Sequence, residues 1–226
     1  MQNNFLDRII IKRTQRKKTI SISIKEGNVI VLSPKLISQC YLNDLLEKKK
    51  NWIEKKLKQE KGKRAIQKRL FLDGEKFLKF GKEKTLIYKK SALTKVEETN
   101  NSIIVYCLQQ KDIKKLIEAW YKDSLNIYLR EKLNFFKELM NLDYNSFIIK
   151  LYKNRLGSCT YSGNLSFNWK IAMMPYDIIN YIIIHELSHL KHFNHSKEFW
   201  KLVEMFCPNY KEKKNWIKEN KSLIFW

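Results

Sequence analysis

The amino-acid sequence predicts an α+β protein in two parts: a β-rich N-terminal domain with one amphipathic helix over residues 1–108, and an α+β domain over residues 109–226. Short runs of β-branched residues predict the strands of the first part, and apolar residues at helical spacing predict the helices of the second. All four histidines of the chain lie within residues 185–195, so the candidate chemistry belongs to the second domain.

The N-terminal domain is expected to contain several short strands and one helix. The expected strands are residues 9–12, 19–24 and 29–32, with further strands within 70–107. Gly27-Asn28 predicts a turn between two of them. After Pro34, apolar residues from Leu42 to Leu57 recur on one side of a Lys- and Glu-rich segment, which predicts an amphipathic helix. Later turns are expected at Asp73-Gly74, Gly81 and Asn100-Asn101.

The C-terminal domain is expected to open with a long helix, because apolar residues repeat at helical spacing from Ile113 to Leu139. The expected strands of this domain are residues 147–152 and 165–169, on either side of the turn-rich segment 157–163. Pro175, a residue suited to the first helical turn, opens the segment that contains the histidines. Two shorter helices follow, separated by Pro208.

The chain carries 45 Lys and Arg against 23 Asp and Glu, a net charge of 45 − 23 = +22. Residues 1–150 hold most of this charge, and the densest basic run is residues 47–69. Such a surface attracts polyanions over long distances. Only seven of the basic residues are Arg, the residue suited to bidentate phosphate contacts. We therefore expect no more than a weak, electrostatic association with nucleic acid or ribosomes through the N-terminal part.

The cysteines and the apolar segments exclude several classes of protein. The four cysteines are far apart and form no CxxC pair, so neither a zinc ribbon nor a disulfide framework is expected. The N-terminus has no apolar core of signal-peptide length. The longest wholly apolar stretch, residues 182–184, is far shorter than the about 20 residues of a membrane span. The sequence therefore predicts a soluble, cytoplasmic protein with no membrane partner.

The segment from residue 180, NYIIIHELSHLKHFNH, contains the motif HExxH as His185, Glu186 and His189. On a helix, imidazoles at i and i+4 project from one face about 6 Å apart along the axis, so both can bind one Zn²⁺. Glu186 points aside from that face and is suited to take a proton from a water on the metal. The apolar residues before His185 place this helix inside the protein, where a metal offsets the cost of burying polar groups.

A catalytic zinc site needs a third protein ligand and an open fourth position. His195 completes the spacing HExxHxxxxxH, which is typical of metzincin-like sites. Those sites have a glycine where this chain has His192, and Asn194 is expected to supply the left-handed turn instead. His192 lies about 10 Å along the axis from the first histidine, too far to share an ion. The alternative to His195 is a downstream carboxylate, Glu198 or Glu204, as in a thermolysin-like site.

Further motifs around the histidines resemble one known family. The matching segments are 154–159 (NRLGSC), 163–169 (GNLSFNW), Pro175, 181–190 (YIIIHELSHL), 194–196 (NHS) and 199–200 (FW). Together they resemble the YgjP-like metallopeptidase family, a relative of the SprT and WLM zincins, over about residues 150–217. The N-terminal strand, Pro34 and the helix ending in Trp52-Ile53 also resemble this family.

The resemblance implies a zincin-like catalytic domain that contains the HExxH helix. It also implies one zinc ion, bound by His185, His189 and His195, and Glu186 as the catalytic residue. One position departs from the family, because Leu156 stands where a Trp is usual. This departure affects the packing beside the site and leaves the metal chemistry intact.

Other residues near the motif are candidates for contacts with a substrate. Arg155 and Asn168 are the candidate substrate-binding residues, although Arg155 could instead anchor the loop at 157–163. Residues 165–169 are either the edge strand that takes an extended peptide or an ordinary core strand. The remaining candidates for zinc or oxyanion contacts are Cys159, Tyr161 and Tyr176.

These observations lead to a zinc-dependent hydrolase, most simply a metallopeptidase that acts on a peptide or protein substrate. Glu186 would be the general base that takes a proton from a zinc-activated water. One alternative is a metal-dependent nucleotide phosphoanhydride hydrolase, although the sequence has no P-loop and no carboxylate cluster for Mg²⁺. The other is a basic nucleic-acid-binding protein with a structural zinc, although structural sites generally have four protein ligands and no need of Glu186.

Overall fold

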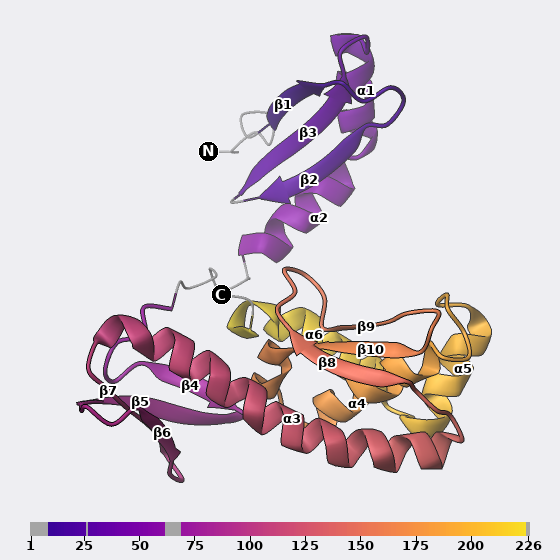
Figure 1. Ribbon diagram of the computed structural model, residues 1–226. Coiled ribbons are helices and arrows are strands. Elements are labelled where there is room, and N and C mark those ends of the chain that lie inside the picture. Colours follow the sequence, from indigo (N-terminus) through magenta and orange to yellow (C-terminus); the bar gives the residue numbers. More distant parts are fainter. Residues whose placement is uncertain (1–8, 26, 62–68, 225–226) are drawn as a thin grey trace. The chain divides into compact units, whose positions relative to one another are not determined.

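The computed structural model describes residues 9–25, 27–61 and 69–224 (Figure 1). The prediction of an α+β fold is confirmed, because runs of strands are followed by runs of helices and the sheets pair strands both parallel and antiparallel. The chain divides into two compact units, Met1–Ala65 and Ile66–Trp226, and each has its own apolar core. The domain boundary therefore lies after residue 65, and the predicted boundary after residue 108 is wrong. Residues 62–68 of the basic run lie outside the described residues.

The first unit contains a three-stranded sheet with helices on one face (Figure 1). The strands are β1 (Ile9–Thr14), β2 (Ser21–Lys25) and β3 (Asn28–Pro34), in the order β1-β3-β2. β3 pairs parallel with β1 and antiparallel with β2. The predicted turn joins β2 to β3, where Lys25 pairs with Asn28 and Gly27 has a φ of +75°. Alternate residues of β3, Val29 and Val31, are fully buried.

The predicted amphipathic helix is two helices in the structure, α1 (Gln39–Lys48) and α2 (Lys50–Lys61). Ser38 caps α1 by accepting a hydrogen bond from the backbone N–H of Tyr41. The helix is interrupted at Lys49. At this point the helical spacing of the apolar residues reaches Lys49 and Lys50, and both lysines are exposed. The buried residues of the stripe, on either side of this break, are Leu42, Leu46, Ile53 and Leu57.

The second unit begins with a four-stranded sheet packed against one long helix (Figure 1). The strands are β4 (Lys76–Lys79), β5 (Lys82–Lys90), β6 (Lys95–Glu98) and β7 (Ser102–Cys107), in the order β4-β5-β7-β6, and the helix is α3 (Ile113–Met140), preceded by the 3₁₀ turn η2 (Gln110–Asp112). Ile103 and Val105 of β7 share one core with Ile117 and Tyr121 of α3. This core joins residues 70–107 to the C-terminal part, which explains the position of the boundary.

The rest of the second unit is a three-stranded sheet with helices packed on it. The strands are β8 (Ser146–Lys150), β9 (Gly157–Cys159) and β10 (Asn164–Asn168), and the helices are η3 (Trp169–Met173), α4 (Tyr176–Ser188), α5 (Lys197–Phe206) and α6 (Tyr210–Ile224). The sheet order is β8-β10-β9, with β10 parallel to β8 and antiparallel to β9. β10 is thus a central core strand, and the edge strand beside α4 is β9. None of the described helices is long and apolar enough to cross a membrane.

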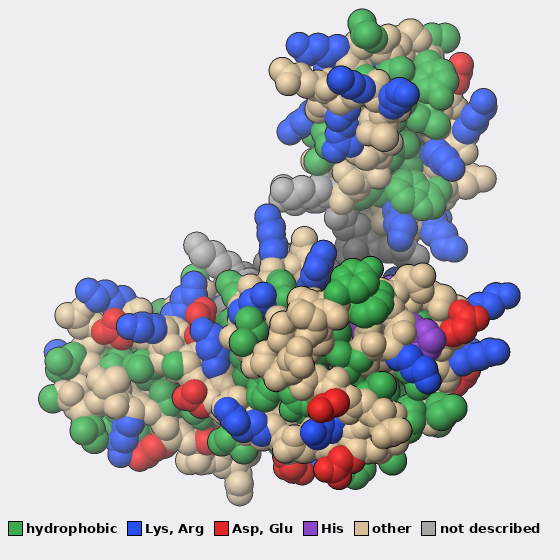
Figure 2. Space-filling model, turned by 45° about the vertical axis from the view of Figure 1, so that its right-hand side comes forward, with side chains coloured by type: hydrophobic (Ala, Val, Ile, Leu, Met, Phe, Trp, Pro, Cys, Tyr) green, Lys and Arg blue, Asp and Glu red, His purple; other side chains and the backbone are tan. Residues whose placement is uncertain are grey.

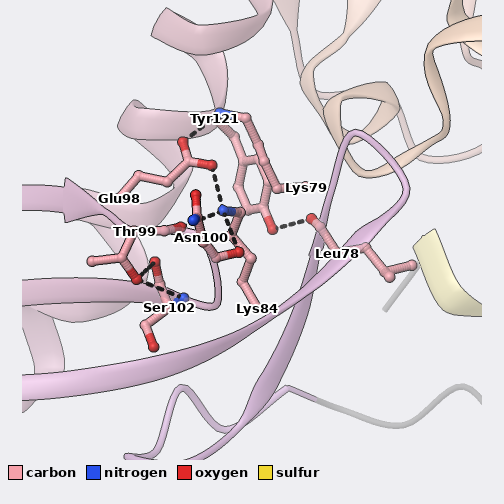
Figure 3. Close-up of polar contacts among 8 residues, drawn as sticks. All are labelled: Leu78, Lys79, Lys84, Glu98, Thr99, Asn100, Ser102 and Tyr121. Atoms are coloured by element: carbon pink, nitrogen blue, oxygen red, sulfur yellow. Dashed lines mark hydrogen bonds and ion pairs between the residues drawn. The ribbon is translucent and has the colours of Figure 1, made fainter.

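Figure 3 shows a group of charges that links β4, β5 and β6, in which two buried lysines face the Glu98 carboxylate, whose side chain is 36% exposed. Lys84 Nζ lies 2.7 Å from Glu98 Oε1 and donates to the backbone oxygen of Thr99 at 2.5 Å. Lys79 Nζ lies 3.7 Å from Glu98 Oε2 and 3.8 Å from the ring centre of Trp120 in α3. Burial lowers the pKa of Lys79 to about 8, although the Glu98 carboxylate opposes this shift. One carboxylate therefore compensates two buried ammonium groups.

Replacement of Glu98 by glutamine is expected to destabilise the second unit by about 2–4 kcal/mol, because it leaves two buried ammonium groups without a counter-charge. Glu97 offers a matched control, since its carboxylate pairs with the exposed Lys95 at 2.5 Å. Loss of such an exposed ion pair costs less than about 1 kcal/mol. Chemical denaturation of Glu98→Gln and Glu97→Gln measures both effects, and equal losses of stability would contradict the role of Glu98 as counter-charge to the two buried lysines.

Candidate metal centre

The end of α4 and the loop that follows bring three histidine side chains together. His185 lies in the last turn of α4, His189 follows the end of this helix, and His195 lies just before α5. Each contributes one ring nitrogen to a group whose members all lie within 4.8 Å of one another. The Nε2 atoms of His185 and His195 are 3.1 Å apart. Figure 2 shows histidine side chains reaching the surface of the second unit.

The alternative third ligands do not join this group. The backbone oxygen of His192, and not its ring, contacts Nδ1 of His189 at 3.0 Å. Glu198 is exposed in the first turn of α5. Glu204 pairs with Lys211 at 3.7 Å. Of the candidates considered from the sequence, His195 is thus the residue that the structure places beside His185 and His189.

The chain returns to the helix end through hydrogen-bonded turns. The backbone N–H of His192 donates to the carbonyl oxygen of Ser188 at 3.0 Å, and Ser196 then caps α5. The expectation of a left-handed Asn194 is wrong, because no residue in the segment 189–196 has a positive φ. The reversal is distributed over several residues, so a single left-handed residue is not required.

Aromatic rings of α5 pack against all three imidazoles. The ring centre of Phe199 lies 5.0 Å from that of His185, 4.6 Å from that of His189 and 4.8 Å from that of His195. Trp200 stacks on His195 at 5.6 Å, and Tyr210 stacks on the Trp200 ring at 5.1 Å. These rings restrict the rotation of the imidazoles. Their signal in the sequence is a pair of adjacent aromatic residues about one helical turn after His195.

Burial favours the neutral form of all three imidazoles. Burial lowers the pKa of His185 to about 3, and burial also lowers the pKa values of His189 and His195. The His192 oxygen beside Nδ1 of His189 favours the tautomer with the proton on Nδ1 and a free lone pair on Nε2. The buried Nδ1 of His185 has no hydrogen-bond partner among the described residues. Three converging neutral nitrogen donors fit a divalent metal ion such as zinc.

The Glu186 carboxylate directly follows the first of these histidines and is only 5% exposed. Burial raises its pKa to about 8, and the positive charge of Arg155 opposes this shift. Within the described part of the chain, its Oε2 atom has no hydrogen-bond partner, an arrangement that costs free energy in a folded protein. A buried carboxylate with a raised pKa is suited to accept and release a proton.

Gly157, the first residue of β9, lets the edge strand pass close to this carboxylate. A Cβ atom at position 157 would lie 2.6 Å from Glu186 Oε1 and 2.8 Å from Glu186 Cδ. Such distances are shorter than van der Waals contact, so the approach requires a residue without a side chain. The sequence placed Gly157 in a turn-rich segment, and nothing in the local pattern predicted this contact.

Asn168 holds the loop that precedes β9. This residue is fully buried, and its amide nitrogen donates to the backbone oxygens of Tyr152 and Arg155 at 3.0 and 2.9 Å. Its side-chain oxygen accepts a hydrogen bond from the backbone N–H of Lys170 at 3.1 Å. The prediction that Asn168 binds substrate is therefore wrong, because this side chain is buried at the end of the central strand and its amide group hydrogen-bonds to the backbone of the loop.

Arg155 and Leu156 lie on the loop that Asn168 anchors. The side chain of Arg155 is exposed, and its charge reaches Glu186. Leu156, the position that departs from the family pattern, is partly buried and packs against the main core of the second unit. Its backbone oxygen accepts a hydrogen bond from the Asn168 N–H at 2.8 Å. The loop thereby places β9 beside α4.

Two other residues singled out from the sequence have different partners. Cys159 donates from Sγ to the backbone oxygen of Thr160 at 3.4 Å, and burial raises the pKa of its thiol to about 11. This disfavours the thiolate that binds metals. Tyr176 begins α4 and stacks on Phe80 at 4.6 Å. It precedes His185 by nine residues, or about 13 Å along the helix axis, too far for an oxyanion donor at this site.

Comparison with known proteins finds one matching family and two similar solved structures. The family described as YgjP-like, metallopeptidase domain, matches residues 18–220. Two solved structures are similar to part of the chain: the metallopeptidase zymogen of Pyrococcus abyssi abylysin (25% identity, 39% of this chain and 90% of that chain, TM-score 0.37) and that of Methanocaldococcus jannaschii jannalysin (22% identity, 38% and 92%, TM-score 0.33). No curated protein matches the chain. Because the family match covers most of the sequence, the chain belongs to the YgjP-like family of metallopeptidase domains.

Proposed function

We propose that this metallopeptidase domain is a zinc-dependent hydrolase of peptide bonds, with His185, His189 and His195 as zinc ligands and Glu186 as general base. The observation that carries the proposal is the convergence of three neutral imidazoles beside a buried carboxylate of raised pKa. Family membership supports peptide bonds as the substrate. A structural zinc is disfavoured, because such sites generally have four protein ligands and no buried carboxylate beside them.

The residues divide the chemistry between them. The three imidazoles would hold a zinc ion, which would act as a Lewis acid that lowers the pKa of a water and polarises a carbonyl oxygen. Glu186 accepts a proton from the attacking water as the water oxygen bonds to the peptide carbonyl carbon. The C–N bond then breaks, and Glu186 returns the proton to the leaving amine nitrogen. The edge of β9 opposite β10 is suited to bind the substrate as an added strand.

The first unit is strongly basic. Residues 1–65 contain 17 Lys and Arg against six Asp and Glu, so 17 − 6 = +11, half of the net charge of the chain. Figure 2 shows Lys and Arg side chains of the described residues spread over the visible face of this unit. We propose that this unit attracts polyanions, nucleic acid among them, weakly and in a salt-dependent manner.

Replacement of Gly157 by alanine is expected to lower kcat by about 10²-fold, because the added methyl group displaces the Glu186 carboxylate. Metal content is expected to stay unchanged, since the methyl group meets the carboxylate and not the imidazoles. Ser158→Ala is a matched control on the same strand, because the Ser158 hydroxyl contacts the Tyr152 hydroxyl at 2.7 Å. Steady-state kinetics and metal analysis of both variants check the prediction. Wild-type turnover by Gly157→Ala would contradict the role of the close approach.

Substrate class is tested by incubating the zinc-loaded protein with a peptide library and, separately, with a panel of nucleoside triphosphates. Glu186→Gln serves as the control in both assays. We expect peptide cleavage that depends on Glu186 and no release of phosphate or pyrophosphate. Hydrolysis of a nucleotide without peptide cleavage would replace the proposed function with that of a phosphoanhydride hydrolase. Binding of zinc without either activity would leave a structural role for the metal.

A further inference from the structure

Two exposed aromatic side chains stack on each other beside the candidate metal centre. Tyr161 lies in the turn between β9 and β10, and Phe193 lies in the loop between the second and third histidines. Their ring centres are 4.1 Å apart with an interplanar angle of 30°. Tyr161 is 85% exposed and Phe193 is 44% exposed, so the stacked pair presents an apolar surface to solvent. Exposed apolar surface next to a functional site is characteristic of ligand binding.

The turn that carries Tyr161 is well defined by its own hydrogen bonds. The backbone N–H of Gly163 donates to the oxygen of Thr160 at 3.0 Å, and the N–H of Asn164 donates to Thr160 Oγ1 at 3.1 Å. The same turn packs on the histidine loop, since a Cβ on Gly163 would lie 3.6 Å from Leu190 Cδ2. Tyr161 and Phe193 therefore meet across two segments that are already in contact.

The position of the pair follows from the course of β9. This strand begins at Gly157 beside the Glu186 carboxylate and leads to Tyr161 four residues later. Four residues of extended chain span about 13 Å, which is an upper limit here because the chain turns after Cys159. A peptide that pairs with the free edge of β9, with its scissile bond at Glu186, would reach the stacked rings within about four residues.

We propose that Tyr161 and Phe193 form a substrate subsite that binds a large apolar side chain, aromatic or aliphatic, within four residues of the scissile bond. The inference rests on the proposed peptidase function. The rings supply a flat apolar surface at small cost in conformational entropy, because each side chain has only two rotatable bonds. Continuity with the edge of β9 selects the substrate itself as the occupant, since the same extended peptide contacts both.

The subsite is tested with peptides of one sequence in which a single position carries Phe, Leu or Ala. Cleavage by the zinc-loaded wild type and binding to the zinc-loaded Glu186→Gln variant are measured for each position. We expect about tenfold higher kcat/KM and affinity for Phe or Leu than for Ala at one position within four residues of the scissile bond. Tyr161→Ala is expected to remove this preference, and Tyr161→Phe is expected to retain it, because the ring and not the hydroxyl makes the contact.

Three controls distinguish this role from others. Phe135→Ala removes a comparably exposed aromatic ring from α3 and is expected to leave the preference unchanged. Zinc content of Tyr161→Ala is expected to equal that of the wild type, and loss of zinc would show that the pair only holds the histidine loop. Loss of turnover in Tyr161→Phe would instead assign the hydroxyl to the chemistry. Either result overturns the subsite, and so does cleavage without preference at any position.

The binding measurement separates the subsite from the proposed function. Selective binding of Phe or Leu peptides by Glu186→Gln, without cleavage by the wild type, would overturn the peptidase function and retain the subsite. Peptide cleavage with equal kcat/KM for all three residues would retain the function and overturn the subsite. Absence of both cleavage and binding would overturn both.

Discussion

Glu186→Gln is expected to lower kcat for peptide hydrolysis by about 10²–10⁴-fold, the usual contribution of a positioned general base. Glutamine has the shape of glutamate but cannot accept and return a proton in the same way. The metal content is expected to remain that of the wild type, because the three imidazoles keep their positions. Kinetic assays on the purified variant, with metal analysis of the same sample, measure both effects.

The same substitution is expected to change the thermal stability of the metal-free protein, as replacement of an exposed surface carboxylate would not. The Glu186 carboxylate is 5% exposed, and its Oε2 has no hydrogen-bond partner in the described part of the chain. Its burial therefore costs free energy, which a neutral amide reduces. We expect metal-free Glu186→Gln to have a Tm equal to or above that of the metal-free wild type. A variant with lower Tm and wild-type turnover would remove Glu186 from the mechanism.

His185→Ala is expected to abolish both metal binding and turnover. This histidine contacts the imidazoles of His189 and His195, with ring centres 5.0 Å from each. Its removal leaves only the nitrogen donors of His189 and His195, and a catalytic zinc site generally requires three protein ligands. Elemental analysis after gel filtration and a peptidase assay measure the two losses.

His192→Ala provides the matched control for this prediction. His192 belongs to the same segment, but only its backbone oxygen contacts the histidine group, through Nδ1 of His189. An alanine at position 192 retains that oxygen, so zinc content and turnover are expected to stay near those of the wild type. Equal losses in His185→Ala and His192→Ala would indicate a general disruption of the loop and would contradict the assigned ligand set.

Local sequence patterns predicted the elements whose signal is periodic. The apolar spacing from Ile113 to Leu139 corresponds to α3 (Ile113–Met140), and Pro175 directly precedes α4. The histidine spacing also selected the three residues that the structure brings together, because positions i and i+4 on a helix are determined by helix geometry alone. His195 could be selected only because its distance from the HExxH motif matches a known kind of metal site. The path by which the loop after His189 returns to the helix end cannot be read from local residue spacing.

The features that the sequence did not predict depend on tertiary contacts. The strands within residues 70–107 belong to the second unit because Ile103 and Val105 pack on α3. The alternation of apolar and polar residues in these strands does not reveal which element their apolar face packs against. β9 consists of Gly-Ser-Cys, which has no β-branched residue, and it is a strand only through pairing with β10. The contact of Gly157 with Glu186 depends on that pairing, and the burial of Asn168 depends on the pairing of β10 with β8; neither could be inferred from spacing.

The central claim is that His195 completes a zinc site with His185 and His189, and metal analysis tests it most directly. Wild type, His195→Ala and Glu198→Ala are each loaded with zinc, freed of excess metal by gel filtration and analysed for bound zinc. We expect about one equivalent in the wild type and in Glu198→Ala, and loss of zinc in His195→Ala. Less than about half an equivalent in the wild type, or a full equivalent in His195→Ala, would contradict the three-histidine site.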